Sequence, residues 1–377
     1  MADFFRTAAA SFLVTSALIL GGALYEKLGQ DPVAAATIEA PSAVLAVAAA
    51  PLGVPPVQAS LLAVSAAPAS SPPVTVAAAD LHPVAEVDAP PLEAEPDGFV
   101  APAWFPAELH ENLLAVEAME GAPLTQGGPD FASRAVFVYD LDAGKVLIAR
   151  NADDRRPVAS LTKLVGALAA MTESPNLDQE LCLQSIDRPS LPGTASKLRS
   201  GTCATGWDFL GASLVRSDNG AAYAMSGVAG LPFETFVERM NSVAGELGMS
   251  QSTFADPSGA EDENLSTARD MTRAVLAASL HPSTAAAVNA PYWDFHDISR
   301  DRVRRLYTTD RIVERKDIDV LGAKTGYTDT ARYCFTAVIR TEDGRRVAFT
   351  MLGAPRNRSR WRDVDRLIDW LNAGGGR

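Results

Sequence analysis

Histidine and cysteine are scarce in this 377-residue chain, which has four of the first and three of the second. No cysteine has a histidine at metal-ligand spacing and no H-E-x-x-H motif occurs, so the sequence disfavours a zinc peptidase. No G-x-S-x-G elbow occurs, and His82 and His110 fall outside the segment expected to fold. A Ser-His-Asp hydrolase is therefore disfavoured too, and a catalytic base must come from another residue type.

Basic residues are almost absent from the N-terminal third. Residues 1–130 hold 15 acidic and 2 basic side chains, whereas residues 131–377 hold 31 of each, so the net charge of −13 belongs to the N-terminal part. The rest shows no basic excess that would suggest a nucleic-acid partner. Residues 31–106 also hold 14 of the 25 prolines and few aromatics. Because such a composition cannot build a packed core, residues 31–125 are expected to be a disordered acidic Ala/Pro-rich tether.

Charge of either sign is missing from residues 7–25. Nineteen such residues are just long enough to cross a bilayer as a helix. The competing interpretation is a cleaved signal peptide, with Arg6 as a thin positive region. We expect residues 1–30 to be an uncleaved membrane anchor or a signal peptide. Either way the chain is exported, periplasmic or extracytoplasmic, with its catalytic domain at residues 126–377.

Two β-hairpins stand at opposite ends of the 126–377 segment, and residues 160–290 between them are mostly helical in pattern. Apolar residues recur at helical spacing from Trp361 to Leu371, and residues 104–120 predict a short amphipathic helix before the domain. The expected fold class is α+β: an antiparallel sheet from both chain ends, flanked by helices, with an inserted mainly helical subdomain. Its strands are expected at residues 133–139, 145–149, 333–340 and 346–353.

A serine and a lysine stand one helical turn apart at the start of an apolar run. Ser160 and Lys163 therefore share a helix face. A lysine whose pKa is lowered by burial can take the proton of a serine hydroxyl, and a helix N-terminus offers free N–H groups to an oxyanion. The alternative is a helix cap beside a solvated lysine, and S-x-x-K alone favours that alternative.

Two further motifs change this balance. Ser217-Asp218-Asn219 follows Ser160 by 57 residues, and Lys324-Thr325-Gly326 follows Ser217 by 107. With S-x-x-K, S-D-N and K-T-G in this order, the chain resembles the penicillin-binding protein and β-lactamase superfamily. Within it, Arg156-Pro-Val-Ala-Ser-Leu-Thr-Lys163 and Gly322-Ala-Lys-Thr-Gly-Tyr-Thr328 resemble the serine-type D-alanyl-D-alanine carboxypeptidases, over about residues 131–372.

The resemblance implies a cofactor-free enzyme that removes the terminal D-Ala from peptidoglycan pentapeptide stems through an acyl-serine, in cell-wall remodelling. β-Lactam antibiotics would acylate the same serine. The implied catalytic residues are Ser160 as nucleophile, Lys163 as base and Ser217 on the proton path to the leaving amine. The implied substrate-binding residues are Asn219, Lys324, Thr325, Gly326 and Tyr327, the last through its backbone N–H.

Three alternatives stay open. A DD-endopeptidase uses the same acyl-serine, and Asp218 and Tyr327 depart from the residues more common in the carboxypeptidases. A β-lactamase needs a glutamate to activate water, but residues 257–266 contain acids without the E-x-x-L-N arrangement. The third alternative is an inactive peptidoglycan-binding scaffold protein, against which the intact Ser160 and Lys163 argue.

Two of the three cysteines lie in short β-like runs joined by a Ser/Pro/Gly-rich connection. In an exported protein Cys182 and Cys203 can form a disulfide, which would close a loop of about 20 residues and contribute roughly 3 kcal/mol. The alternative is two free buried thiols. Cys334 is expected to be core packing.

Overall fold

The computed structural model describes residues 101–113, 115, 119, 128–184 and 196–377. All of them belong to the unit Val87–Arg377. The expected anchor at residues 1–30 and the part of the expected tether up to residue 100 lie outside the described residues. Among the described residues, no helix is both long and apolar enough to cross a membrane.

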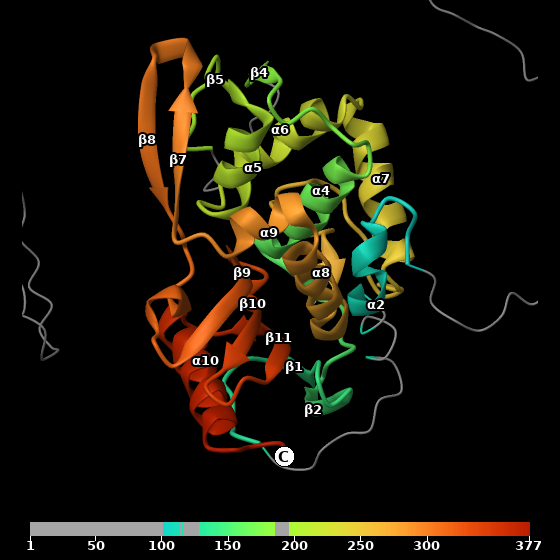
Figure 1. Ribbon diagram of the computed structural model, residues 1–377, viewed down its shortest axis with the longest axis vertical. Helices are drawn as coiled ribbons and strands as arrows, with labels where there is room; N and C mark the ends of the chain where they lie inside the picture. Colours follow the sequence, from blue (N-terminus) through green and yellow to red (C-terminus); the bar gives the residue numbers. More distant parts are fainter. Residues whose placement is uncertain (1–100, 114, 116–118, 120–127, 185–195) are drawn as a thin grey trace, which may run out of the picture. The chain divides into compact units, whose positions relative to one another are not determined.

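An antiparallel sheet of five strands takes its members from both ends of the described chain, in the order β2-β1-β11-β10-β9 (Figure 1). This confirms the predicted α+β class and the predicted sheet. The edge strand β9, which carries Lys324, pairs with β10 and adds a strand to the two expected hairpins. The strands are β1 (Ala135–Asp140), β2 (Lys145–Arg150), β9 (Ile318–Thr328), β10 (Arg332–Thr341) and β11 (Arg346–Ala354).

Alternate residues of the central strands face two separate cores. On β1, Phe137 and Tyr139 belong to the core shared with helix α8 (Ala268–Leu280), whereas Val136 and Val138 belong to the core shared with helix α10 (Asn357–Asn372). Figure 1 shows the two helices on opposite faces of the sheet. Because both faces are covered, the central strands are apolar at nearly every position.

The segment between the sheet strands is mainly helical, as predicted. Helix α4 lies at its centre, and every residue of α4 is buried. After the stretch predicted to be mostly helical, residues 160–290, the chain forms an extended hairpin that was not predicted, β7 (Tyr292–Asp297) with β8 (Arg302–Tyr307), which projects beside the helices in Figure 1. The helices are α4 (Thr162–Met171), α5 (Gly206–Leu214), α6 (Asn219–Ala229), α7 (Phe233–Glu246) and α9 (Pro282–Val288).

Residues 101–113 pack on the folded unit, although the sequence assigned them to the tether. They form the short helices η1 (Ala107–Leu109) and α2 (His110–Leu113). Phe105 and Leu113 are buried in the core, and the indole N–H of Trp104 donates to Glu246 on α7. A tether that runs to residue 125 is therefore wrong for residues 101–113, because their aromatic and leucine side chains bury apolar area on the folded unit.

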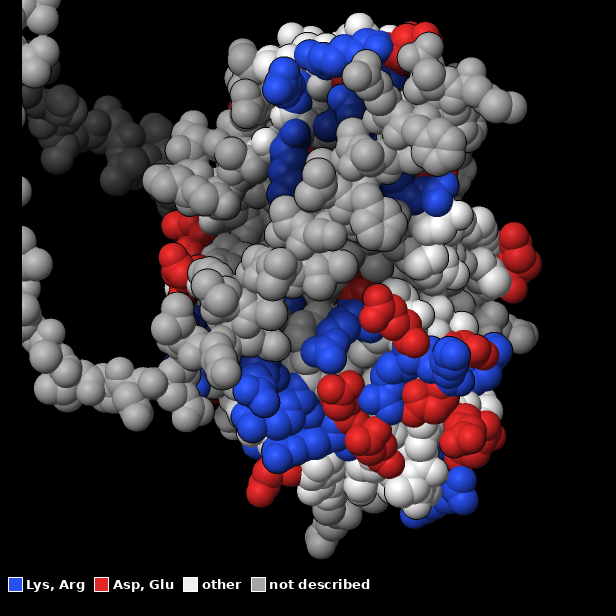
Figure 2. Space-filling model, turned by 90° about the vertical axis from the view of Figure 1, so that its left-hand side faces the viewer, with Lys and Arg blue, Asp and Glu red and all other residues white. Residues whose placement is uncertain are grey.

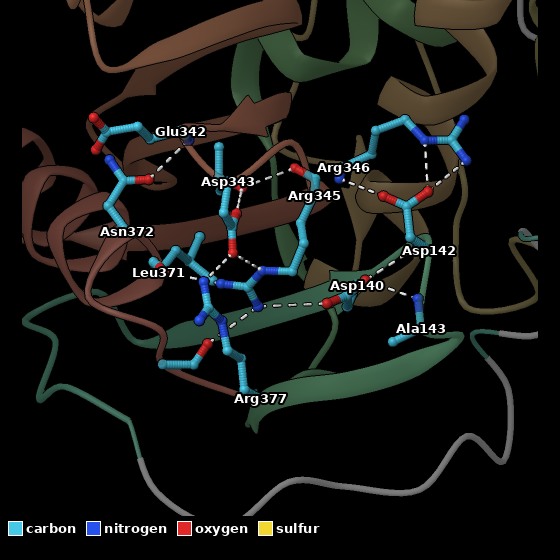
Figure 3. Close-up of polar contacts among 12 residues, drawn as sticks. Asp140, Asp142, Ala143, Glu342, Asp343, Arg345, Arg346, Leu371, Asn372 and Arg377 are labelled. Atoms are coloured by element: carbon cyan, nitrogen blue, oxygen red, sulfur yellow. Dashed lines mark hydrogen bonds and ion pairs between the residues drawn. The ribbon is translucent and has the colours of Figure 1, made fainter.

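Ion pairs join the turns of the two terminal hairpins (Figure 3). Arg345 lies 3.5 Å from Asp140 and 3.0 Å from Asp343, and Arg346 lies 2.7 Å from Asp142. The Arg346–Asp142 pair is exposed and contributes at most about 1 kcal/mol, whereas Asp140 is buried beside Arg345. The pairs align the β1–β2 turn with the β10–β11 turn.

A disulfide joins Cys182 of β4 (Glu180–Cys182) to Cys203 of β5 (Cys203–Thr205). Cys334 is buried and free. Peptide mapping of the purified chain without reductant should recover the 182–203 pair. Since the bridge closes a loop of about 20 residues, Cys182→Ser should lower the free energy of unfolding by about 3 kcal/mol in denaturant titrations. Reductant should lower the free energy of unfolding of the unaltered chain to that of Cys182→Ser. If the unaltered chain and Cys182→Ser are equally stable without reductant, the bridge is contradicted.

Candidate active site

Ser160 lies in a 3-10 turn, η2 (Ala159–Leu161), that leads directly into α4. The chain enters this turn from β3 (Arg156–Pro157), which pairs with β6 (Leu265–Ser266). The serine is thus fixed by strand pairing on one side and by a buried helix on the other. The sequence predicted it in the first turn of the helix itself, and the structure moves it one tight turn earlier.

Two glycines allow the backbone to approach the serine closely. Ala159 has φ 51°, which is unfavourable for a residue with a side chain. A Cβ on Gly259 would lie 1.9 Å from the Ala159 carbonyl oxygen, so only glycine fits behind this strained turn. A Cβ on Gly326 of β9 would lie 3.2 Å from the Ser160 backbone nitrogen. The Ser160 N–H therefore lies beside the edge strand that carries the third motif.

Lys163 sits at the centre of the polar contacts. Its Nζ lies 2.9 Å from Ser160 Oγ, 2.7 Å from Asn219 Oδ1 and 2.5 Å from the carbonyl oxygen of Ser258. A neutral amine has two N–H donors and one lone pair. The two oxygens that can only accept match the donors, which leaves the lone pair for the Ser160 hydroxyl proton.

The environment of Lys163 favours that neutral form near pH 7. The side chain is only 1% exposed, and burial lowers the pKa of Lys163 to about 7, although the charges of Asp256 and Asp218 act in the opposite direction. Loss of hydration penalises the charged form of a buried amine. The lysine can therefore accept a proton at physiological pH, which a solvated lysine cannot do.

A loop after α7 supplies the Ser258 carbonyl, and one carboxylate organises this loop. Asp256 accepts the backbone N–H groups of Ser258, Gly259 and Glu261 and the side-chain amide of Asn264. The sequence analysis missed this loop as part of the site. Asp-Pro-Ser-Gly is a turn signature, so the turn could have been found, but a backbone carbonyl leaves no side-chain signal for its target.

The second motif is placed by a helix cap. Asp218 accepts the Ala221 backbone N–H at 3.0 Å as the N-cap of α6, and it also accepts the Ser196 hydroxyl at 2.6 Å. Its carboxylate therefore fixes the loop rather than facing Ser160. Ser217 before it has φ 60°, in the left-handed region, and Asn219 after it reaches Lys163.

Lys324 connects the second and third motifs. Its Nζ donates to Ser217 Oγ at 2.8 Å and to the Thr325 carbonyl at 3.0 Å. Burial, followed by the charges of Lys163 and Arg360, holds the pKa of Lys324 well below its usual range. An anion bound at this position would favour the charged form of the amine.

The residues after Lys324 are held from two sides. Thr325 Oγ1 lies 2.5 Å from Thr309 Oγ1, and the Gly326 carbonyl accepts from Arg360 of α10 at 3.3 Å. The Tyr327 side chain is exposed and hydrogen-bonds away from this cluster. Thr309 and Arg360 lie outside the motifs, so nothing in the sequence pattern pointed to them.

The structure thus brings seven of the eight candidate catalytic and substrate-binding residues into one connected cluster. The eighth, Tyr327, follows Gly326 on β9; its exposed side chain lies outside the cluster, and the role predicted for it is that of its backbone N–H. Among the described residues, no group of three or more His, Cys, Asp or Glu side chains is placed to hold a metal ion. The cluster members are Ser160, Lys163, Ser217, Asn219, Lys324, Thr325 and Gly326.

Comparisons with known proteins all match this chain to D-alanyl-D-alanine peptidases. A family model described as D-alanyl-D-alanine carboxypeptidase (Peptidase_S11) matches residues 122–356. The chain is 28% identical over 259 residues to the D-alanyl-D-alanine endopeptidase of Escherichia coli K12, covering 68% of this chain and 83% of that protein. It is 31% identical over 255 residues to the enzyme of the same name from Pseudomonas aeruginosa, covering 67% and 81%. A solved D-alanyl-D-alanine carboxypeptidase from Mycobacterium tuberculosis H37Rv superposes with a TM-score of 0.59 at 26% identity, covering 67% of this chain and 95% of that one.

Proposed function

Because the chain belongs to the D-alanyl-D-alanine carboxypeptidase family, peptidase S11, we propose that it is a serine DD-carboxypeptidase. Its substrate is the pentapeptide stem of peptidoglycan, from which it removes the terminal D-Ala. The observation that carries the proposal is the buried amine of Lys163, with a pKa of about 7, at 2.9 Å from Ser160 Oγ.

In the acylation step, neutral Lys163 takes the hydroxyl proton of Ser160 while Oγ attacks the carbonyl carbon of the penultimate D-Ala. The lysine then has three N–H donors, and Asn219 Oδ1 and the Ser258 carbonyl already accept two of them. The Ser160 backbone N–H, and by family resemblance that of Tyr327, stabilise the oxyanion.

The leaving group departs on the side of Ser217 and Lys324. As the peptide C–N bond breaks, Ser217 Oγ, hydrogen-bonded to Lys324 Nζ, relays to the leaving amine the proton that Lys163 took from Ser160. Ser217 and Lys163 thereby return to their starting protonation states. The carboxylate of the leaving D-Ala pairs with Lys324 and Thr325, which compensates the buried amine for its lost hydration. Water then hydrolyses the acyl-enzyme ester and restores the Ser160 hydroxyl.

The same acylation applies to β-lactam antibiotics, whose strained amide would be opened by Ser160. We further propose that the chain acts outside the cytoplasm, held at the inner membrane by the uncharged segment at residues 7–25. An inactive scaffold would not be labelled by penicillin, and a β-lactamase would release the opened antibiotic rapidly instead of retaining it.

A second candidate function is DD-endopeptidase activity on cross-linked stems. The names of the E. coli and P. aeruginosa relatives favour it. Both reactions cut a bond between D-centres through the same acyl-serine and differ only in the leaving group. Incubating the full chain with pentapeptide stems and with cross-linked dimers separates the two activities. A carboxypeptidase releases free D-Ala from the pentapeptide, whereas an endopeptidase converts dimers to monomers.

Lys324→Ala tests the carboxylate site. Loss of a charge-assisted contact should raise KM for the pentapeptide about tenfold to a hundredfold, measured by D-Ala release. Lys316→Ala, at an exposed lysine of the same domain, should leave KM unchanged. A chain that cleaves dimers but leaves pentapeptides intact would show that the carboxypeptidase proposal is wrong while the acyl-serine chemistry stands.

A further inference from the structure

Two adjoining cavities beside the catalytic cluster each have four basic side chains in their lining. Figure 2 faces the β7–β8 hairpin, and among the coloured side chains in its upper part Lys and Arg predominate. The first cavity has a volume of about 300 Å³ and the second about 150 Å³, and they share Arg304 of β8. We name the pair the basic groove. Four bases and one acid line its first cavity: Lys197, Arg216, Arg304 and Arg305, with Asp218.

The positive charge of the first cavity is only partly balanced by the protein. Arg305 pairs with Asp294 at 2.7 Å, but among the residues the structure describes Lys197, Arg216 and Arg304 form no ion pair. The one acid, Asp218, already accepts hydrogen bonds as a helix cap.

Arg304 shows the imbalance most clearly. Its Nε is buried with no hydrogen-bond partner among the described residues. Its guanidinium lies over the Phe295 ring, with 5.7 Å from Cζ to the ring centroid. Clustered like charges repel one another. The cations of Lys197, Arg216 and Arg304 around one cavity therefore fit an anionic ligand bound between them.

The basic groove adjoins the leaving-group side of the catalytic cluster. One wall contains Arg216, the residue before Ser217. Another contains Tyr307, two residues before Thr309, whose backbone N–H donates to the Val215 carbonyl at 3.2 Å. The Thr309 hydroxyl also contacts Thr325. The segments that position Ser217 and Thr325 are therefore the segments that form the first cavity.

We propose that the basic groove binds the carboxylates of the leaving peptide strand when the substrate is a cross-linked peptidoglycan dimer. This inference rests on the proposed acyl-serine function and deepens its second candidate activity, cleavage of cross-links, by naming the site that holds the leaving strand. Lys324 and Thr325 take the one carboxylate that a leaving D-Ala possesses. A leaving group that is itself a stem peptide carries further carboxylates beyond the scissile bond, and the nearest unbalanced cations are those of the basic groove.

The test compares substrates that differ only in charge on the leaving strand. The full chain is assayed on a cross-linked dimer, on the same dimer with the leaving-strand carboxylates amidated, on pentapeptide and with fluorescent penicillin. Lys197→Gln and Arg304→Gln should each lower kcat/KM for the carboxylate dimer about tenfold, mainly through KM, as expected for one charged contact. Arg304→Lys should restore much of that loss. The amidated dimer, the pentapeptide and penicillin should change less than about twofold.

Arg362→Gln is the matched control. Arg362 is exposed on α10, which packs on the five-stranded sheet and contributes no residue to the basic groove. The inference is wrong if the groove variants cleave the carboxylate dimer like the unaltered chain, or lose pentapeptide hydrolysis equally. It is also wrong if the unaltered chain releases D-Ala but does not cleave dimers. Failure of penicillin labelling in the unaltered chain would instead contradict the proposed function.

Discussion

Ser160→Ala is expected to abolish covalent labelling by fluorescent penicillin and release of D-Ala from pentapeptide, while the chain stays folded. The substitution removes the atom that would form the acyl ester, and no other hydroxyl is bonded to Lys163 in the contacts the structure shows. Lys163 keeps Asn219 Oδ1 and the Ser258 carbonyl, so the free energy of unfolding should change by less than about 1 kcal/mol. Gel fluorescence and thermal unfolding measure the two effects.

Ser226→Ala is a suitable control for this variant. Ser226 lies on α6 in the same helical subdomain, and its hydroxyl donates only to the Tyr223 carbonyl one turn earlier. Labelling of this control should equal that of the unaltered chain. Persistent acylation of Ser160→Ala would show that another residue is the nucleophile, and the assignment of S-x-x-K would then fail.

The parts of the fold that the sequence predicted are those with a local signal. The β1–β2 and β10–β11 hairpins carry alternating patterns around short turns, and both form. The β7–β8 hairpin was not predicted, although it has one buried face: Phe295 belongs to the core, and Trp293 and Leu306 pack against it. On β8 this face is hidden in the sequence, because Val303 and Tyr307 are apolar but exposed.

The site residues, too, were predicted where a local sequence signal exists and missed where it does not. The spacing of Ser160 and Lys163 on one helical turn fixes their proximity, and the motif order fixed which segments should join them. The long-range partners have no such sequence signal. The Ser258 carbonyl could come from any residue type, and Gly259 is required by its φ of +77° and by the Ala159 carbonyl that lies behind it. The pKa of Lys163 is lowered because the packed helices bury its amine. The spacing of residues along the sequence does not show how deeply a side chain is buried.

That environment leads to the second large effect, a dependence of acylation on the charge of Lys163. With a pKa of about 7, the amine is protonated below pH 7 and cannot take the serine proton. The second-order rate constant for penicillin acylation should therefore rise about tenfold per pH unit below 7 and level off above it. Lys163→Met should lower the plateau by about 10²–10⁴-fold and remove the rise near pH 7. Stopped-flow or quenched labelling across pH 5–9 measures both.

Lys163→Arg separates proton transfer from simple electrostatics. A guanidinium keeps the positive charge that would attract a developing oxyanion, but it stays protonated throughout this pH range and cannot act as a base. If Lys163 is the base, the arginine variant should be as slow as the methionine variant. An arginine variant that acylates much faster than the methionine variant would mean that positive charge suffices. A flat pH profile in the unaltered chain would likewise contradict a lysine that loses its proton near pH 7, and the contacts of Lys163 with Asn219 and Ser258 would then serve only to position the side chain.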